Sequence, residues 1–159
     1  MFEKCVELLK SRGVLLDDIA DCVLFLQQKH HPEILKEEIV EIVEGILKKR
    51  EVQHAVLTGI ALDIGAERNE LFDPELCDIL TSDFSLYGVD EVLAYGICNL
   101  YGSIALTNYG YIDREKPCII GRLNNDKSQC NCYLDDIVGA IAAAAASKLA
   151  HIHSPEVNP

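Results

Sequence analysis

Apolar side chains recur every three or four positions along most of the chain, which is the spacing of helices that bury one face. The segment 33–49 shows this clearly, because its isoleucine, leucine and valine positions share one face while glutamate and lysine occupy most of the other. Convincing strand alternation is absent. The pattern therefore predicts an all-α fold, a single bundle of about six or seven helices. The expected helices are 2–11, 17–29, 33–49, 51–67, a short one after Pro74, 89–107 and about 134–150.

The last of these segments lacks the polar face that the others have. From Ile137 to Ala146 it holds no polar side chain, and six alanines stand among its small residues. Alanine favours the helix and lets neighbouring backbones approach closely. We therefore expect a central helix at about 134–150 that the other helices surround, with Ala140, Ile141 and Ala144 almost inaccessible to solvent.

Length and composition are sufficient for one domain without crosslinks. A chain of 159 residues, 49% of them hydrophobic, can bury roughly two-thirds of its unfolded surface, so we expect one helical domain over 1–150. The segment 151–159, which includes His151 and His153, is expected to be a flexible tail. Seven scattered cysteines, an odd number, indicate reduced thiols rather than a disulfide framework. Cys130 and Cys132 lack the spacing of a structural zinc site.

The charge and hydropathy of the chain restrict its partners. A formal net charge of −12 without a basic stripe argues against nucleic-acid binding, because nothing would offset phosphate repulsion. The longest uncharged apolar stretch, about 137–147, is too short to cross a bilayer, and no N-terminal signal pattern is present. We expect a cytoplasmic protein with no transmembrane segment. A peripheral role at a membrane surface and assembly into a homo-oligomer both stay open.

Two of the apolar helices begin with adjacent acids. Asp90 and Glu91 open the helix at 89–107, and Asp135 and Asp136 open the central one. One acid is enough to cap a helix, and a buried second carboxylate must be paired, hydrogen-bonded, protonated or metal-bound. Helix N-terminal dipoles favour ionised carboxylates, the form that metal ligands must take. A cation shared between the two pairs would satisfy them all.

Further polar groups accompany these acids. Every fourth residue of the segment 89–107 is polar, so these side chains should line one cavity or seam, or else satisfy one another. They are Glu91, Tyr95, Asn99, Ser103 and Thr107. Beyond them, Asp113 and Lys116 are three residues apart and would share one helix face, adding a carboxylate and a cation that can pair with phosphate.

The order of these motifs resembles the phosphatidylglycerophosphatase A family, in particular its soluble branch without membrane spans. The motifs cover roughly residues 86–150: Asp90-Glu91, then Asp113-x-x-Lys116-Pro117, then Asp135-Asp136-Ile137-Val138 before small apolar residues. The resemblance implies a magnesium-dependent phosphomonoesterase of lipid metabolism that acts on phosphatidylglycerophosphate, with the matched acids as its catalytic centre.

Two departures from the membrane enzymes leave the substrate open. Their Pro-Gly-Thr type motif has no counterpart here, and Leu57-Thr58-Gly59 is the nearest feature. They also contain transmembrane helices, which this sequence does not predict. A chain without such helices must meet its lipid headgroup at the interface or use a soluble phosphate ester instead.

The residue types themselves agree with this chemistry, because Mg²⁺ prefers carboxylate and water oxygens and can activate a bound water. Asp113 is expected to be a further ligand or the base that orients water, and Lys116 to stabilise charge on phosphoryl oxygens. Whether an aspartate attacks phosphorus directly stays open. The expected metal ligands are Asp90, Glu91, Asp135 and Asp136; the catalytic candidates are Asp90, Asp113, Lys116 and Asp135; the substrate-binding candidates are Arg114, Arg122, Asn99 and Ser103.

An all-α nucleotide pyrophosphohydrolase is an alternative enzyme. Its acids would be Glu41-x-x-Glu44 followed by Glu70-x-x-Asp73. Against it, Pro74 interrupts a continuous helix after the second pair, and the first pair lies on a charged face that simple solvation explains.

A catalytically silent helical module for regulation or interaction is the non-enzymatic alternative. Such a module would retain the core of the family without its activity. Convergence of the acids at 90, 91, 113, 135 and 136 on a pocket with Lys116 would favour the phosphatase. Convergence of the pyrophosphohydrolase acids would favour the nucleotide enzyme, and no convergence would favour the module.

Overall fold

The computed structural model describes residues 1–152, which form nine α-helices and no strand. The prediction of an all-α fold is therefore confirmed, although the described residues form nine helices instead of six or seven. They are α1 (Phe2–Ser11), α2 (Leu16–Gln27), α3 (Lys36–Leu47), α4 (Arg50–Glu67), α5 (Pro74–Thr81), α6 (Val89–Asn99), α7 (Ser103–Glu115), α8 (Cys118–Asn125) and α9 (Leu134–Ile152).

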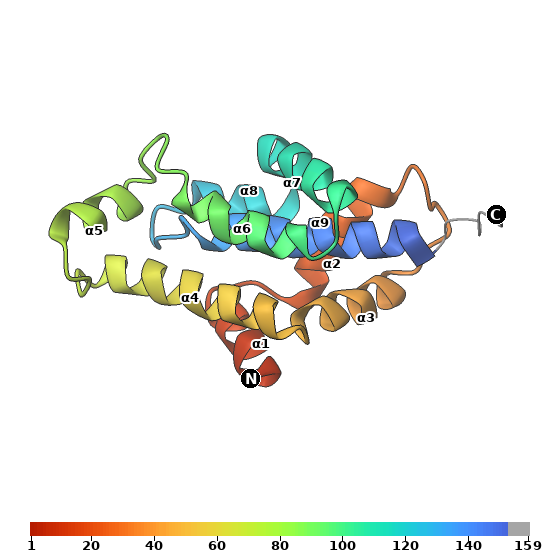
Figure 1. The fold of residues 1–159 in the computed structure, drawn as a ribbon, viewed down its shortest axis with the longest axis horizontal. Helices are drawn as coiled ribbons and strands as arrows, with labels where there is room; N and C mark the ends of the chain where they lie inside the picture. Colours follow the sequence, from red (N-terminus) through yellow and green to blue (C-terminus); the bar gives the residue numbers. More distant parts are fainter. Residues whose placement is uncertain (153–159) are drawn as a thin grey trace.

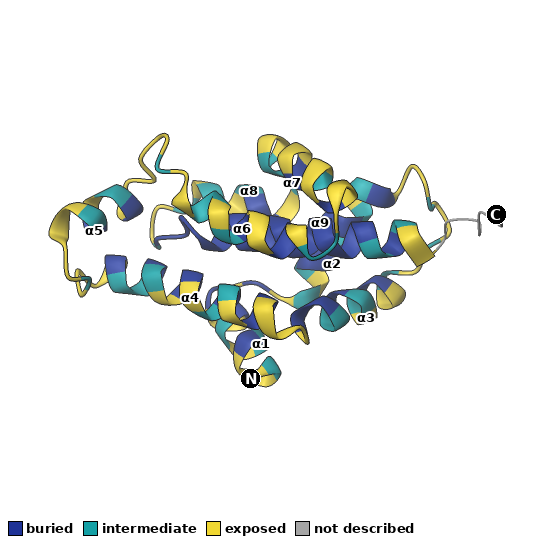
Figure 2. Cartoon of the chain, viewed as in Figure 1, coloured by how far each residue is buried: buried dark blue, intermediate teal, exposed yellow. Residues whose placement is uncertain are grey.

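Helix α9 lies at the centre, as its composition predicts. It runs along the long axis of the molecule, with α7 on one side and α3 and α4 on the other (Figure 1). Helices α2, α6 and α8 also pack against it. Every residue from 134 to 147 is buried, and Ala140, Ile141 and Ala144 have no exposed surface, so the helix is dark blue over most of its length in Figure 2.

Small side chains allow the close approach of α4 to α9. A Cβ atom at Gly59 would collide with the Ile137 side chain and lie 3.0 Å from Cβ of Tyr133. The feature Leu57-Thr58-Gly59 therefore has a packing role here, because only glycine fits between these helices.

The predicted helix at 89–107 is wrong in one respect, because it is two helices. Helix α6 ends at Asn99 and α7 begins at Ser103, and Gly102 between them has φ = 81°, a conformation that favours glycine. The two helices then pack against each other instead of continuing in line. The polar positions of 89–107 thus do not form one stripe.

The remaining expectations concern the chain end, the membrane and the thiols. Among the described residues, no helix is both long and apolar enough to cross a membrane. All seven cysteines are free thiols, and six of them are buried. His151 lies in the last turn of α9, whereas His153 and the rest of the expected tail, 153–159, fall outside the described residues.

Candidate functional site

One pocket collects the acids that the sequence analysis singled out. The start of α6 contributes Asp90 and Glu91, and the start of α9 contributes Asp135 and Asp136. The end of α7 adds Asp113, and Lys116 follows directly as the C-terminal cap of that helix. The loop 83–88 and Asn124 complete the lining. Three helix ends that are far apart in sequence therefore meet at one place.

Lys116 lies among the carboxylates as their shared cation. Its ammonium donates hydrogen bonds to Asp113 (2.7 Å) and Asp135 (2.9 Å), and lies 3.8 Å from a carboxylate oxygen of Asp136. Burial by itself would lower the pKa of Lys116, but the charge of Asp135 and the bond to Asp113 raise it above its ordinary value. The side chain therefore stays charged.

The backbone around Lys116 is shaped to hold this position. Lys116 has φ = 47°, the left-handed conformation that ends a helix sharply. A Cβ atom at Gly121 in α8 would collide with the Lys116 carbonyl oxygen, so glycine is required where α8 passes this turn. Pro117, which cannot continue a helix, then separates α7 from α8.

Asp135 and Asp136 are buried despite their charge, with 6% and 5% of their surface exposed. The backbone N–H of Asp136 donates to the Asp135 carboxylate (3.0 Å). Burial raises the pKa of both groups, and the negative charge of Asp135 raises that of Asp136 further, while Lys116 opposes the shift. The single positive charge of Lys116 therefore does not compensate for the burial of these two carboxylates.

Asp90 and Glu91 form the other wall of the pocket. The Asp90 carboxylate accepts the N–H of Glu91 (2.9 Å) and lies 3.5 Å from the Cys132 thiol, and Tyr95 donates to Glu91 (3.2 Å). Asp83, from the loop before α6, joins this wall. One ligand atom from each of Asp83, Asp90 and Cys132 lies within 4.8 Å of the others.

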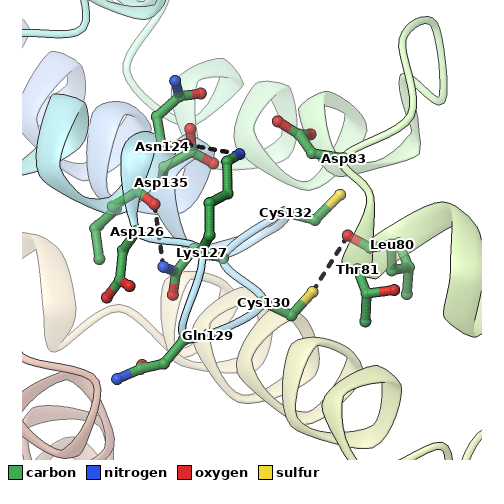
Figure 3. A pocket seen from close by; sticks show the side chains of 12 residues that line it. Leu80, Thr81, Asp83, Asn124, Asp126, Lys127, Gln129, Cys130, Cys132 and Asp135 are labelled. Carbon is green, nitrogen blue, oxygen red and sulfur yellow. Dashed lines mark hydrogen bonds between the residues drawn. The ribbon is translucent and has the colours of Figure 1, made fainter.

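A second hollow borders the acidic pocket and shares Asp83, Asn124 and Asp135 with it. Figure 3 shows the loop 126–133 curving around this hollow, with the Cys130 thiol hydrogen-bonded to the Leu80 carbonyl oxygen near the end of α5. This contact ties the loop that precedes α9 to the α5 side of the molecule.

Asp63 is a buried carboxylate that the sequence analysis missed. It lies on α4 with no exposed surface and accepts the backbone N–H groups of Tyr133 and Leu134, each at 3.0 Å. Burial raises the pKa of Asp63 to about 7, although these two hydrogen bonds lower it. Asp63 therefore caps the first turn of α9 from another helix and fixes the backbone that carries Asp135 and Asp136.

An ion pair supports the same stretch of backbone. The Arg12 guanidinium forms a salt bridge with Glu67 and donates to the Cys130 carbonyl oxygen (2.6 Å). The Glu67 carboxylate in turn accepts the Cys130 N–H (2.7 Å). Arg12, which follows α1, and Glu67 of α4 thus bind the carbonyl oxygen and the N–H of the same residue, Cys130, shortly before α9 begins.

The four residues predicted to bind substrate lie outside the lining of the acidic pocket. Asn99 and Ser103 are exposed beside the turn between α6 and α7. Arg114 is exposed and pairs with Glu115 (2.7 Å), and Arg122 donates to the Gly13 carbonyl oxygen. None of the four is among the residues that line the acidic pocket.

The acids of the alternative nucleotide enzyme do not converge in the described residues. Glu44 pairs with Lys48 on α3 (3.2 Å), and Glu41 is exposed on the same helix. Asp73 caps α5 through the Glu75 N–H (2.9 Å), and Glu70 lines a different depression from Glu41. The acids at 90, 91, 113, 135 and 136, which do share one pocket, are therefore favoured as the functional cluster over those of the alternative enzyme.

Comparisons by sequence and by structure both find similar proteins over most of the chain. The family described as phosphatidylglycerophosphatase A matches residues 18–151. The uncharacterized protein YutG of Bacillus subtilis is 59% identical over 145 residues, which are 90% of this chain and 86% of that protein. The uncharacterized protein MJ1330 of Methanocaldococcus jannaschii is 28% identical over 79% of this chain and 94% of its own.

Two solved structures share the whole fold. The low temperature requirement C protein from Listeria monocytogenes superposes with a TM-score of 0.92 at 55% identity, over 97% of each chain. A Bacillus stearothermophilus protein of unknown function gives the same TM-score at 52% identity, over 97% of this chain and 96% of that one.

Proposed function

This chain belongs to the phosphatidylglycerophosphatase A family, and we propose that it is a magnesium-dependent phosphomonoester hydrolase with the acidic pocket as its active site. The observation that carries the proposal is that five carboxylates from three separate helix ends line one pocket together with Lys116. They are Asp90, Glu91, Asp113, Asp135 and Asp136.

The donor set of the pocket fits a divalent cation. Six carboxylates line the pocket with Lys116 as its one ammonium, and burial raises the pKa values of Asp135 and Asp136. Such an excess of buried negative charge is costly unless a cation shares it. Asp90, Glu91, Asp135 and Asp136 would hold Mg²⁺, which prefers such oxygen ligands. When bound, Mg²⁺ would neutralise phosphate charge and lower the pKa of a coordinated water.

The chain's own residues would supply positioning and charge stabilisation. In hydrolysis a water oxygen forms a bond to phosphorus, the ester P–O bond breaks, and the departing alcohol oxygen regains a proton. The Lys116 ammonium, held by Asp113 and Asp135, would stabilise the negative phosphoryl oxygens. Asp113 is only half-buried and would accept the proton of the attacking water.

The rim of the pocket supports a lipid ester as substrate. Phe84 and Leu86 line the pocket opening from the loop before α6, and their exposed fractions are 65% and 101%. Apolar side chains so exposed beside a phosphate site suit the acyl region of a phospholipid such as phosphatidylglycerophosphate. A protein with this rim would act at a membrane surface without spanning it.

A panel of phosphomonoesters tests the proposal. With Mg²⁺, the purified chain should release inorganic phosphate from phosphatidylglycerophosphate in detergent micelles or vesicles, or from a soluble glycerophosphate-like monoester. Chelation of the metal should stop release. Absence of release across the panel, with Mg²⁺ binding demonstrated by calorimetry, would instead favour a catalytically silent module.

Mg²⁺ and protons should stabilise the same part of the fold. The pKa values of Asp63, Asp135 and Asp136 are raised on folding, so the folded chain binds more protons than the unfolded chain above pH 4. Unfolding temperature without metal should therefore fall as pH rises from 5 to 8, and Mg²⁺ should restore it in a saturable way. Asp136→Asn should abolish the Mg²⁺ gain. A metal-free unfolding temperature that climbs from pH 5 to 8 would contradict this expectation.

A further inference from the structure

Tyr109 carries a buried hydroxyl that the described structure leaves without a hydrogen bond. Its side chain lies in α7 with 1% of its surface exposed, and within residues 1–152 the hydroxyl makes no hydrogen bond of full geometry. Buried tyrosine hydroxyls ordinarily find a partner, because a buried donor that makes no hydrogen bond destabilises the fold. This unpaired donor therefore needs a specific explanation.

The packing of the Tyr109 ring directs the hydroxyl towards the acidic pocket. The ring meets Tyr95 edge to face, with centroids 5.4 Å apart, and its edge packs on Gly139, where a Cβ atom would lie 3.6 Å from Cε2. Asp136 lies three residues before Gly139, on the same face of α9. After burial, the charge of the Asp136 carboxylate is the main cause that raises the pKa of Tyr109, which indicates that the hydroxyl is near this carboxylate although the two make no hydrogen bond of full geometry.

Within the described residues, the Asp136 carboxylate likewise accepts no side-chain hydrogen bond of full geometry. The nearest cation, the Lys116 ammonium, is 3.8 Å away, and its hydrogen bonds go to Asp113 and Asp135. The Tyr109 hydroxyl and the Asp136 carboxylate therefore approach each other at the α7–α9 contact without a hydrogen bond of full geometry.

We propose that Tyr109 is a positioning residue for Asp136: its hydroxyl donates a hydrogen bond to one carboxylate oxygen while the other oxygen binds the cation. The inference rests on the proposed function, because it takes Asp136 as a metal ligand. A carboxylate that binds a metal through one oxygen needs a donor at the other to hold its orientation. Loss of such an outer partner typically weakens metal binding about 10–100-fold.

Tyr109→Phe tests the inference because it removes only the hydroxyl. Calorimetry on the full chain should show the dissociation constant for Mg²⁺ rising by about tenfold or more. The unfolding temperature of the metal-free variant should stay unchanged or rise, because the lost hydroxyl is buried without a partner. Tyr111→Phe is the matched control, since Tyr111 is exposed on the same helix and stacks on Phe25. It should change neither value.

The outcomes separate this inference from the function on which it rests. Parent-like Mg²⁺ affinity in Tyr109→Phe would overturn the inference, as would weaker affinity accompanied by a lower metal-free unfolding temperature, because that indicates a merely structural role. A parent that binds no Mg²⁺ at millimolar concentration would overturn it together with the metal site. Weakened binding in the variant, with no phosphate release by the parent, would support the inference and remove only the proposed reaction.

Discussion

Asp135→Asn should reduce Mg²⁺-dependent phosphate release by roughly 10²–10⁴-fold while leaving helical content unchanged. Asparagine has nearly the same size as aspartate, so the buried start of α9 should still pack. It has no charge, however, and can neither bind Mg²⁺ strongly nor hold the Lys116 ammonium as the carboxylate does at 2.9 Å. Phosphate release and circular dichroism measure the two effects separately.

A gain of stability should accompany this loss of activity. The pKa of Asp135 is raised by burial, so its ionised form opposes folding at neutral pH in the absence of metal. The neutral asparagine removes that cost, and the metal-free variant should unfold at a higher temperature than the parent at pH 8. This combination distinguishes an active-site carboxylate from one that only supports the fold.

Companion variants define the boundaries of the site. Asp90→Asn should lose activity to a similar extent, and Lys116→Ala should slow turnover more than it weakens Mg²⁺ binding. Glu41→Gln should have no effect, because Glu41 is exposed on α3 away from the pocket. Full activity in Asp135→Asn would exclude the pocket from the chemistry.

Asp63→Ala should destabilise the protein by roughly 2–5 kcal/mol, the second large effect. The substitution removes the acceptor of two backbone N–H groups at the start of α9 and leaves them buried without partners. It also leaves a cavity between α4 and the chain that enters α9. Urea denaturation near pH 6 measures the change in free energy of unfolding.

The pH dependence of this effect has a definite sign. Asp63 has a pKa of about 7 in the folded protein against 3.8 as its ordinary value, so its contribution to stability is greatest below pH 4 and is lost as pH rises through 7. The cost of Asp63→Ala should therefore be larger at pH 6 than at pH 8. Asp78→Ala, an exposed aspartate on α5, is the control and should change stability by less than about 0.5 kcal/mol. Equal stabilities of Asp63→Ala and the parent would contradict the capping role.

The order of the helices and the core of the site follow from local sequence. The 3.6-residue period identifies most helices, and the uninterrupted apolar run from Ile137 to Ala146 identifies α9 as the central one. The acid pairs and the spacing of Asp113 and Lys116 are also local signals, because helix ends attract acids and residues three apart share a face. These patterns are short and need no knowledge of distant contacts.

Sequence periodicity was least informative where the backbone changes direction. The polar positions at 89–107 keep helical spacing across Gly102, so the pattern does not reveal that α6 ends and α7 turns back against it. Asn99 and Ser103 consequently lie at the turn and not in the pocket. Arg114 and Arg122 are candidates because of their charge, but the direction of each side chain depends on which face of its helix packs inward.

The partners of Asp63 and Tyr109 were decided only by the tertiary structure. Asp63 is the one charged residue between positions 55 and 66, a sign of an unusual environment, but its partners lie 70 and 71 residues away. Nothing in the sequence distinguishes Tyr109 from the nearby Tyr111, because burial of its hydroxyl depends on tertiary packing. The sequence by itself determined most of the helices and the acids at the starts of α6 and α9, because those preferences are local. The packing of α4 and α7 on α9 decided which buried groups cap or face those acids, because hydrogen bonding and desolvation depend on atoms brought together across the whole chain.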